Sequence, residues 1–382
     1  IFIINYCRIF MGSIDFNKHN DKKRILVAPL DWGLGHATRC IPIIKELLNH
    51  HCEVYIAAEK NIFFLLKKEF PSLVFLRCKG YEIEYGQNKN DFFAKMFFQF
   101  PKIFLSILNE NTWLKKIVAA YEIDAVISDN RLGMYSKKIP SIYITHQLHI
   151  KTGNRFTDLI AQKIHYFFIK KYTQCWVPDN KKNDLAGELS HPKKIPSNVV
   201  YIGILSRFHS LSLENFYDLL ITISGPEPQR SLFEKKILKE LENFSGNVLL
   251  VRGLPADSNS LPSTNSIKIV NHLSAEDLNR ALEQSKMIIG RSGYTTMMDM
   301  AALKKKAILI PTPGQTEQEY LAKYNFKRNY FFSVDEDKFS IVSTLKNAAL
   351  FEFKPIDISS EEYKKTIEEF VLSLKSGNFA TQ

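Results

Sequence analysis

The stretch KMIIGRSGYTTMMDMAALKKKAILIPTP, residues 286–313, decides the fold class of this chain. Its apolar residues 287–290 predict a short buried strand, and the glycines at 290 and 293 predict a turn directly after it. A helix is expected to open near Tyr294, and 307–311 predict the next strand. A strand, a glycine turn, a helix and a second strand form one unit of a parallel sheet covered by helices.

The same alternation extends over most of the chain on both sides of this stretch. Its periodicity lapses at 203–212, which divides the predicted strands into two series. The sequence therefore predicts an α/β fold of two doubly wound, Rossmann-like domains that face a cleft, spanning 22–205 and 213–355, with a helical segment 356–378 packing back toward the first domain. The other predicted strands are 24–30, 53–58, 73–76, 125–128, 141–144, 175–177, 199–202, 219–224, 247–252 and 267–270.

Composition narrows the class of protein. The 382 residues are 45% hydrophobic and 24% charged, which is typical of a folded protein, and the formal net charge of +11 favours anionic partners. Nucleic acid is not expected among them, because the sequence has no zinc-ligand spacing, arginine-rich tail or RNA-binding signature. The five cysteines are scattered and never form a C-x-x-C pair, which favours a reducing compartment.

The first ten residues, IFIINYCRIF, lack the basic start and small-residue cleavage site of a signal peptide. We expect translation to begin at Met11 and these residues to be an upstream extension. No apolar run is long enough to cross a bilayer. The protein is therefore expected in the cytoplasm, with peripheral attachment to the inner face of the cytoplasmic membrane as an option.

The turn at 290–293 has the features of a phosphate site. It lies where a strand ends and a helix begins, so backbone N–H groups and the helix dipole favour an anion there. Gly293 lets the backbone approach a ligand closely, Ser292 and Thr295 offer hydroxyls, and Arg291 offers a guanidinium.

Two further groups surround this turn. Asp299 lies four residues after Thr295 on the same helix face, where its oxygens could accept the vicinal hydroxyls of a ribose. The alternative is a favourable acid near a helix N-terminus. Glu317 and Gln318 follow the next strand and open another helix, where they could bind sugar hydroxyls from the side opposite Asp299.

These motifs resemble the donor half of GT-B glycosyltransferases, and specifically the family that includes the N-acetylglucosaminyltransferase making lipid II. The resemblance rests on R-S-G-x-T-x-x-x-D and on P-x-P-G-Q-x-E-Q-E-Y-x-A. It implies that Asp299 binds the donor ribose and that Glu317 and Gln318 contact the transferred sugar. It also implies that 22–205 is the acceptor-side domain and 213–355 the nucleotide-sugar donor domain.

Two other loops of the second domain fit the resemblance less closely. Ser224 and Gly225 resemble part of the family's glycine turn beside the diphosphate, and Arg230 could pair with a phosphate there. An ordinary proline-stiffened loop is the alternative. Leu273 occupies the position where the family contacts the nucleobase through its backbone.

The first domain supplies a loop, Gly33-Leu34-Gly35-His36, that resembles the family's glycine loop ending in histidine. An inverting transfer needs a base for the acceptor hydroxyl, and His36 has the right intrinsic pKa. Alternatively, His36 caps its helix or binds acceptor phosphate.

Asp129 follows another strand and is the other candidate base, or else a structural partner of Arg131. His146 and Gln147 follow the next strand and resemble the family's H-E-Q-N motif, with Gln147 where the family usually has a carboxylate. The catalytic residues are thus predicted as His36 and Asp129, with Gly33, Gly35, His146 and Gln147 on the acceptor side.

The segment 92–108, FFAKMFFQFPKIFLSIL, carries six phenylalanines and two lysines. Pro101 is expected to split it into two short helices. It is either the buried cover of a sheet or, beside a lipid-linked acceptor, a peripheral membrane contact.

Together these features predict a UDP-sugar-dependent glycosyltransferase that transfers a sugar, with N-acetylglucosamine as the first choice, to a lipid-linked or cell-envelope saccharide. The transfer is expected to invert the configuration of the sugar and to need no metal or other cofactor. The sole D-x-D, at 335–337, lacks pocket context in the sequence. An epimerase or hydrolase of the same fold, and a non-catalytic UDP-sugar-binding module, are the alternatives.

Overall fold

A computed structural model describes residues 22–31, 33–81, 89–151, 154–182, 184–255, 257, 259–359 and 361–377, and the side chains of its longest helix from Pro101 onward. The expectations for residues 1–10 and Met11 lie outside the described residues, as do the side chains of 92–100.

The first half of the chain forms a seven-stranded parallel sheet in the order β3-β2-β1-β4-β5-β6-β7. The order reverses between β1 and β4, so the loops after these two strands open beside each other at the carboxyl edge. The strands are β1 (Arg24–Pro29), β2 (Glu53–Ala57), β3 (Val74–Leu76), β4 (Ala125–Asp129), β5 (Ser141–Ile144), β6 (Gln174–Val177) and β7 (Val199–Tyr201).

The second half forms a six-stranded parallel sheet in the order β10-β9-β8-β11-β12-β13. Every strand predicted from the sequence is present, and the α/β fold of two Rossmann-like sheets is confirmed. Only β13, two residues long, was not predicted, because so short a strand leaves no period to detect. The strands are β8 (Tyr217–Thr222), β9 (Val248–Val251), β10 (Ile267–Val270), β11 (Ser285–Arg291), β12 (Ala307–Ile310) and β13 (Phe332–Ser333).

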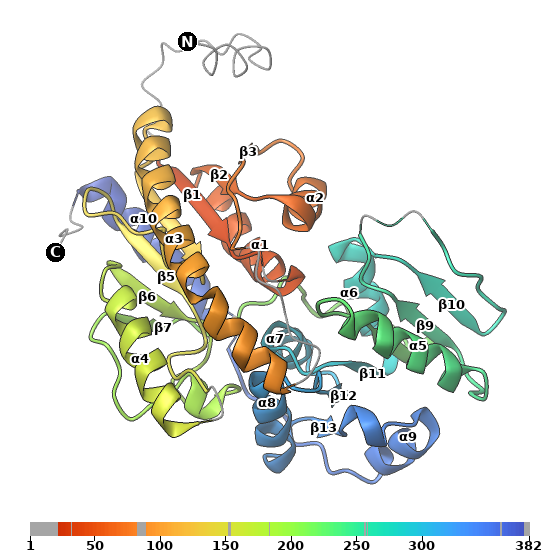
Figure 1. Cartoon of the computed structure of the whole chain (residues 1–382). Coiled ribbons are helices and arrows are strands. Elements are labelled where there is room, and N and C mark those ends of the chain that lie inside the picture. Colours follow the sequence, from red (N-terminus) through yellow and green to blue (C-terminus); the bar gives the residue numbers. More distant parts are fainter. Residues whose placement is uncertain are drawn as a thin grey trace.

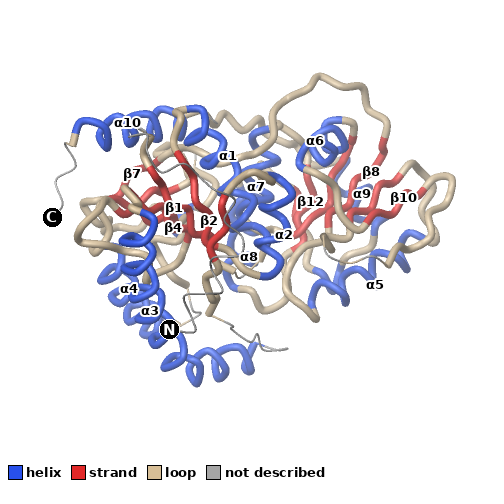
Figure 2. Tube along the Cα trace, turned by 90° about the horizontal axis from the view of Figure 1, so that it is seen from above, coloured by secondary structure: helices blue, strands red, loops and turns tan. Residues whose placement is uncertain are grey.

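Helices cover both sheets, and α1, α7 and α8 lie between them (Figures 1 and 2). The largest apolar cluster runs from α1 through α7 without interruption, so the facing halves share one core. The helices are α1 (Leu34–Asn49), α2 (Lys60–Glu69), α3 (Lys89–Tyr121), α4 (Arg155–Ile169), α5 (Gln229–Leu241), α6 (Ala275–Glu283), α7 (Tyr294–Ala302), α8 (Thr316–Lys327), α9 (Ile341–Ala349) and α10 (Glu362–Ser376), with 3-10 turns at Gly187–Leu189 and Glu336–Lys338.

The last helix, α10, lies on the first sheet rather than on the second (Figure 1). Ile367, Phe370 and Val371 are buried in the shared core, and the ring of Phe370 meets Trp176 of β6 edge-on at 5.4 Å.

The prediction that Pro101 divides its segment into two short helices is wrong. Pro101 lies inside the single helix α3, which runs from Lys89 to Tyr121. A proline removes one backbone donor, but the helix is held beyond it by tertiary packing. Ile103 and Ile107 pack against α4, and Leu114 packs against the first sheet. No helix in the described ranges is both long enough and apolar enough to cross a membrane.

Candidate functional site

The N-termini of α1 and α7 meet between the two halves. Gly33 and Gly293 are their N-cap residues, and neither helix has a side-chain cap. Thr295 donates from Oγ1 to the backbone oxygen of Gly35 at 3.2 Å, which joins the two predicted glycine loops directly. A Cβ on Gly35 would lie 3.3 Å from that Oγ1, so glycine permits this approach. Uncapped N-termini leave backbone N–H groups free to bind an anion.

A buried polar network lies beside this meeting point. Asp129, at the end of β4, is fully buried, and Arg39 of α1 is only 2% exposed. Arg39 donates from Nε to Asp129 Oδ2 at 2.7 Å and from Nη2 to Oδ1. His36 presents Nδ1 to the same pair, 3.2 Å from Asp129 Oδ2 and 2.9 Å from Arg39 Nη2. His36, one turn before Arg39, keeps 19% of its side chain exposed, so it is the member of this trio that a ligand can reach.

Two alternatives left open by the sequence are wrong. Asp129 does not pair with Arg131, whose Nε donates instead to Glu110 Oε1 at 2.7 Å. His36 does not cap its helix, because α1 has no side-chain cap.

His146 extends the network across to the second half. Its Nδ1 lies 3.2 Å from Arg39 Nη1, and its Nε2 lies 2.6 Å from Oε1 of Glu317, the second residue of α8. Its ring stacks on Tyr294 of α7 with centroids 4.2 Å apart. His36, Asp129, His146 and Glu317, all predicted from the sequence, are therefore brought together.

Burial and charge set the protonation of this network. Burial lowers the pKa of His36, Arg39 adds to that effect, and Asp129 opposes it. Burial alone would raise the pKa of Asp129, but the charge of Arg39 holds it below its usual range. Burial likewise acts to raise the pKa of Glu317, and the pairing with His146 outweighs it. The network thus holds ionised carboxylates beside a neutral His36.

Asp299 lies on α7, buried under the segment that joins the two halves. Its Oδ1 accepts a hydrogen bond from Ser206 Oγ at 2.7 Å. Burial raises the pKa of Asp299 to about 6, against the opposing effects of Arg207 and Ser206. Asp299 is not in the first turn of α7, so the proposed helix-dipole explanation does not apply to it.

Other predicted donor residues hold the local loops in place. Ser292 donates from Oγ to the backbone oxygen of Gln318 at 3.0 Å, and Gln318 Oε1 accepts from the backbone N–H of Thr312 at 2.9 Å. Ser224 and Gly225 are exposed, and a Cβ on Gly225 would meet open space.

The two predicted arginines are committed elsewhere. Arg291 is 1% exposed, donates from Nη1 to Glu336 at 2.6 Å and stacks on Phe233. Arg230 donates from Nε to Glu227 at 2.6 Å and contacts Glu234. The structure does not bring either guanidinium to the point where α1 and α7 meet. Leu273 and Gln147 are both half-buried, and Leu273 packs against the shared core.

Arg39 and Tyr294 belong to the network but were not among the predicted site residues. A signal for Arg39 exists in the sequence: it is the one charged residue in the run 37–44, whose other residues are apolar except for Thr38. A charge in such a run indicates a buried partner. Tyr294 offers no such signal, because an aromatic residue at a helix start is equally compatible with the core.

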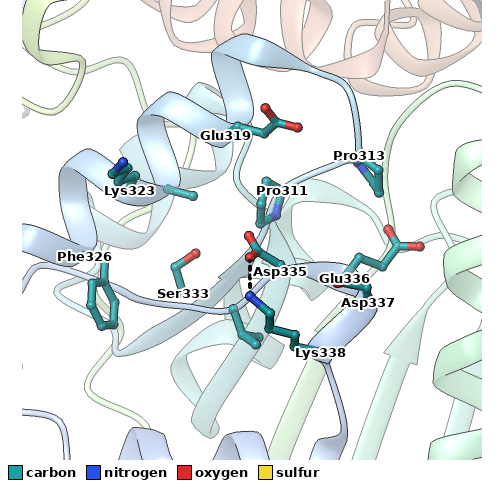
Figure 3. A pocket seen from close by; sticks show the side chains of 12 residues that line it. Pro311, Pro313, Glu319, Lys323, Phe326, Ser333, Asp335, Glu336, Asp337 and Lys338 are labelled. Atoms are coloured by element: carbon teal, nitrogen blue, oxygen red, sulfur yellow. Dashed lines mark hydrogen bonds and ion pairs between the residues drawn. The ribbon is translucent and has the colours of Figure 1, made fainter. Parts of the chain in front are cut away.

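The expectation that the D-x-D at 335–337 lacks pocket context is wrong. Asp335, Glu336 and Asp337 line a cavity of about 780 Å³ at the carboxyl ends of β12 and β13 (Figure 3). Two of these carboxylates already have partners, Glu336 in Arg291 and Asp335 in Lys338 at 3.3 Å. Within the described ranges, the one group whose geometry could hold a metal ion is Asp179, Asp184 and His191, and the oxygens of Asp179 accept four hydrogen bonds from its own loop and Ser190.

Comparisons with known proteins identify the fold and the class of enzyme. Residues 235–374 match the glycosyltransferase family 28 C-terminal domain. An uncharacterized glycosyltransferase of Methanosarcina acetivorans is 23% identical over 327 residues, covering 78% of this chain and 81% of that protein. The UDP-N-acetylglucosamine–N-acetylmuramyl-(pentapeptide) pyrophosphoryl-undecaprenol N-acetylglucosamine transferase of Listeria monocytogenes is 23% identical over 335 residues, covering 83% and 85%.

Solved structures show the same fold. The glycosyltransferase SnogD of Streptomyces nogalater has a TM-score of 0.58 at 14% identity, with 92% of this chain and all of that one covered. A proposed UDP-N-acetylglucosamine 2-epimerase of Listeria monocytogenes has a TM-score of 0.54 at 10% identity, covering 94% and 97%. The chain is therefore a glycosyltransferase of the GT-B fold, and residues 235–374 of its second half match the family 28 C-terminal domain.

Proposed function

We propose that this glycosyltransferase moves a sugar, with N-acetylglucosamine as the first choice, from a UDP-sugar to a lipid-linked or cell-envelope saccharide. The observation that carries the proposal is the meeting of His36, Asp129 and His146 of the first half with Thr295 and Glu317 of the second. The transferase of Listeria monocytogenes, whose name specifies this donor sugar and a lipid-linked acceptor, supports the choice of substrates.

His36 is the proposed base. Its neutral imidazole takes the proton of the acceptor hydroxyl as the acceptor oxygen forms a bond to C1 of the sugar. The bond between C1 and the phosphate oxygen breaks on the opposite face, so the configuration inverts and UDP leaves with the electron pair. The uncapped N-termini of α1 and α7 offer N–H groups to the charge that develops on the diphosphate.

We propose that Asp129 supports His36 and does not act as the base itself. Because its carboxylate is fully buried, it has no access to an acceptor, whereas His36 has. For His36 to act as base through Nε2, the proton of the ring must lie on Nδ1 and point to Asp129. Arg39 Nη2, which lies 2.9 Å from Nδ1, must then donate to Asp129 Oδ1 and not to His36. Asp129 then orients the ring and stabilises the imidazolium that forms.

The second half is proposed to hold the donor. Glu317 and Gln318 bind the hydroxyls of the transferred sugar, and Asp299 binds the ribose. In the present structure Glu317 is bonded to His146, so the sugar competes with an imidazole for this carboxylate.

We further propose that no metal ion takes part, because the diphosphate charge can be met by the two helix N-termini. The transfer rate is then expected to be the same in excess EDTA and in added Mg²⁺. A rate that depends on the divalent ion contradicts this part of the proposal.

The acceptor's lipid implies contact with an anionic membrane. α3 and α4 pack together through Ile103, Ile107, Ile164 and Phe168. Large apolar side chains on both helices are 45–70% exposed, with the exposed Lys102, Lys163 and Lys170 nearby: Phe104, Leu105, Leu108, Phe156, Leu159, Ile160 and Phe167. Exposed apolar side chains among lysines fit a peripheral membrane surface.

The decisive assay incubates the purified chain with labelled UDP-N-acetylglucosamine and vesicles that carry a polyprenyl-pyrophosphoryl saccharide. The expected result is one labelled lipid per UDP released, with the β-linkage that inversion gives from an α-linked donor. Parallel reactions with other UDP-, TDP- and GDP-sugars test the donor.

The other outcomes identify the alternatives. Loss of the UDP-sugar without acceptor, with release of free sugar or of an epimer, indicates a hydrolase or epimerase. Calorimetric binding of UDP-sugar without turnover indicates a binding module. Absence of UDP binding contradicts the proposed donor.

A further inference from the structure

The contacts of the buried Arg39 are with polar and titratable groups of the network. It is a helix residue with 2% of its side chain exposed, and its guanidinium contacts both oxygens of Asp129 and one nitrogen each of His36 and His146. A guanidinium stays charged in proteins and only donates. Its charge therefore decides how the other members of the network hold their protons.

A carboxylate beside an imidazole normally favours the imidazolium. The Asp129 oxygen lies 3.2 Å from Nδ1 of His36, close enough to have that effect. An imidazolium cannot accept a proton, so an unopposed Asp129 would lower the fraction of His36 that is able to act as base near neutral pH. Arg39 forms a bidentate pair with that carboxylate and compensates its charge.

We propose that Arg39 is a positioning residue for the transfer reaction: by holding both oxygens of Asp129, it keeps His36 uncharged and able to take the acceptor proton. The inference rests on the proposed role of His36 as base. It adds a residue that touches neither substrate and acts through Asp129.

The charged and titratable groups that face His36 come from four elements. They are Arg39 on α1, Asp129 on β4, His146 after β5 and Glu317 on α8. Burial lowers the pKa of His36, with Asp129 raising it and Arg39 lowering it. Removing the charge of Arg39 therefore raises the pKa of His36, and the base is lost to protonation at a higher pH than in the wild-type protein.

The test replaces Arg39 with Gln and measures kcat against pH. A nearby charge shifts a pKa by about 1–3 units, so the acidic limb of the profile should move up by that amount. Activity lost at pH 7 should return at higher pH, while the KM of the donor stays within about threefold. A kcat that is lowered equally at every pH, or that is unchanged, overturns the proposal.

Two further variants keep the test decisive. In Arg39→Gln/Asp129→Asn the carboxylate that attracts the proton is also gone, so the acidic limb should return to the wild-type position or below it. If the acidic limb of the double variant remains at the higher pH of Arg39→Gln, the proposal is contradicted. If Arg39→Gln does not fold, Arg39→Lys keeps the charge and should shift the limb by less than one unit, whereas a folded but inactive Arg39→Lys protein overturns the inference.

The matched control for Arg39→Gln is Arg131→Gln, and the matched control for Arg39→Lys is Arg131→Lys. Arg131 lies in the same half, is 1% exposed and pairs with the buried Glu110. Its loss should lower the Tm without moving the pH profile.

Titration of ¹⁵N-histidine-labelled protein by NMR separates this inference from the proposed function, because it needs no turnover. The His36 resonance, assigned by its absence in His36→Asn, should titrate at higher pH in Arg39→Gln than in the wild-type chain. If the wild-type chain transfers no sugar, the proposed function fails while the titration still tests Arg39. If the chain is active and the titration does not move, the role of Arg39 fails alone.

Discussion

The two halves of the molecule differ in how their charged groups are paired. In the first half, Arg39 contacts His36, Asp129 and His146, and three of these four residues are almost fully buried. In the second half, Arg291 and Arg230 bind carboxylates of their own domain, and Asp299 is held by Ser206. The first half thus holds a preassembled set of titratable groups, which is the arrangement that the proposed proton transfer requires.

The second half, by contrast, brings one carboxylate, that of Glu317, to the meeting point, together with backbone N–H groups and a hydroxyl. Its uncapped α7 and the hydroxyl of Thr295 lie at the meeting point, while its arginines do not. Chemistry that moves a proton requires fixed geometry, whereas a diphosphate can be held by N–H groups and a helix dipole. The difference predicts that variants in the first half lower kcat and that variants in the second raise the donor KM.

The largest effect is expected for His36→Ala. Loss of a general base typically lowers kcat by about 10²–10⁴-fold, with donor affinity intact, which steady-state kinetics and calorimetry can measure. His50→Ala, at the other end of α1 beside Glu46, is the control and should keep full kcat. Retained turnover in His36→Ala would move the base elsewhere.

Asp299→Ala should raise the donor KM by roughly 10–100-fold with kcat little changed, since a hydrogen bond to a charged group contributes about 1.5–3 kcal/mol. Ser206→Ala removes the present partner of Asp299 and leaves the carboxylate, so its KM should change far less. An unchanged KM in Asp299→Ala refutes the ribose assignment.

The same carboxylate predicts a pH dependence of donor binding. Burial raises its pKa to about 6, so above that pH it is ionised and able to accept the ribose hydroxyls that we propose it binds. As the pH falls below about 6, the carboxyl becomes protonated and the donor Kd should rise. Calorimetry at several pH values measures this change, and Asp299→Asn should abolish it. An equal pH dependence in Asp299→Asn would assign it to another group.

Away from the meeting point of α1 and α7, Leu105→Glu should weaken binding to anionic vesicles by about tenfold, because burying such a side chain contributes roughly 1.5 kcal/mol or more. Leu105 is 59% exposed on α3. Leu350→Glu, at a position 80% exposed in the second half, is the control and should sediment with vesicles like the wild-type chain. Equal losses in the two variants would argue against a localised surface.

The smallest effect on the donor KM is expected for Arg291→Lys. Its guanidinium is bound to Glu336 and stacked on Phe233, so the substitution should lower the Tm by several degrees and leave KM within about twofold. A KM raised tenfold in a folded variant would place Arg291 in the donor site and erase the contrast between the halves.

The sequence alone predicted the strands and several of the residues that the structure brings together, and both predictions have the same physical basis. Buried parallel strands are recognisable in a sequence as short apolar runs. Ligand-binding residues of α/β sheets lie just after those runs, and His36, Asp129 and Glu317 occupy such positions. Partners across the fold were not predictable. Whether Arg291, beside its glycine turn, faces a phosphate or Glu336 depends on the packing of a loop that is distant in sequence. Pro101 likewise lies within a continuous helix because the residues after it pack against α4 and the first sheet.

The position of α10 has a consequence for how the chain reaches its native state. Phe370 packs edge-on against Trp176, and α10 contacts α1, although α10 follows the whole second sheet in the sequence. The first sheet therefore keeps an apolar face uncovered until the residues after the second sheet have been made. A protein truncated before residue 362 is expected to lose stability in its first half, which is far from the cut in sequence.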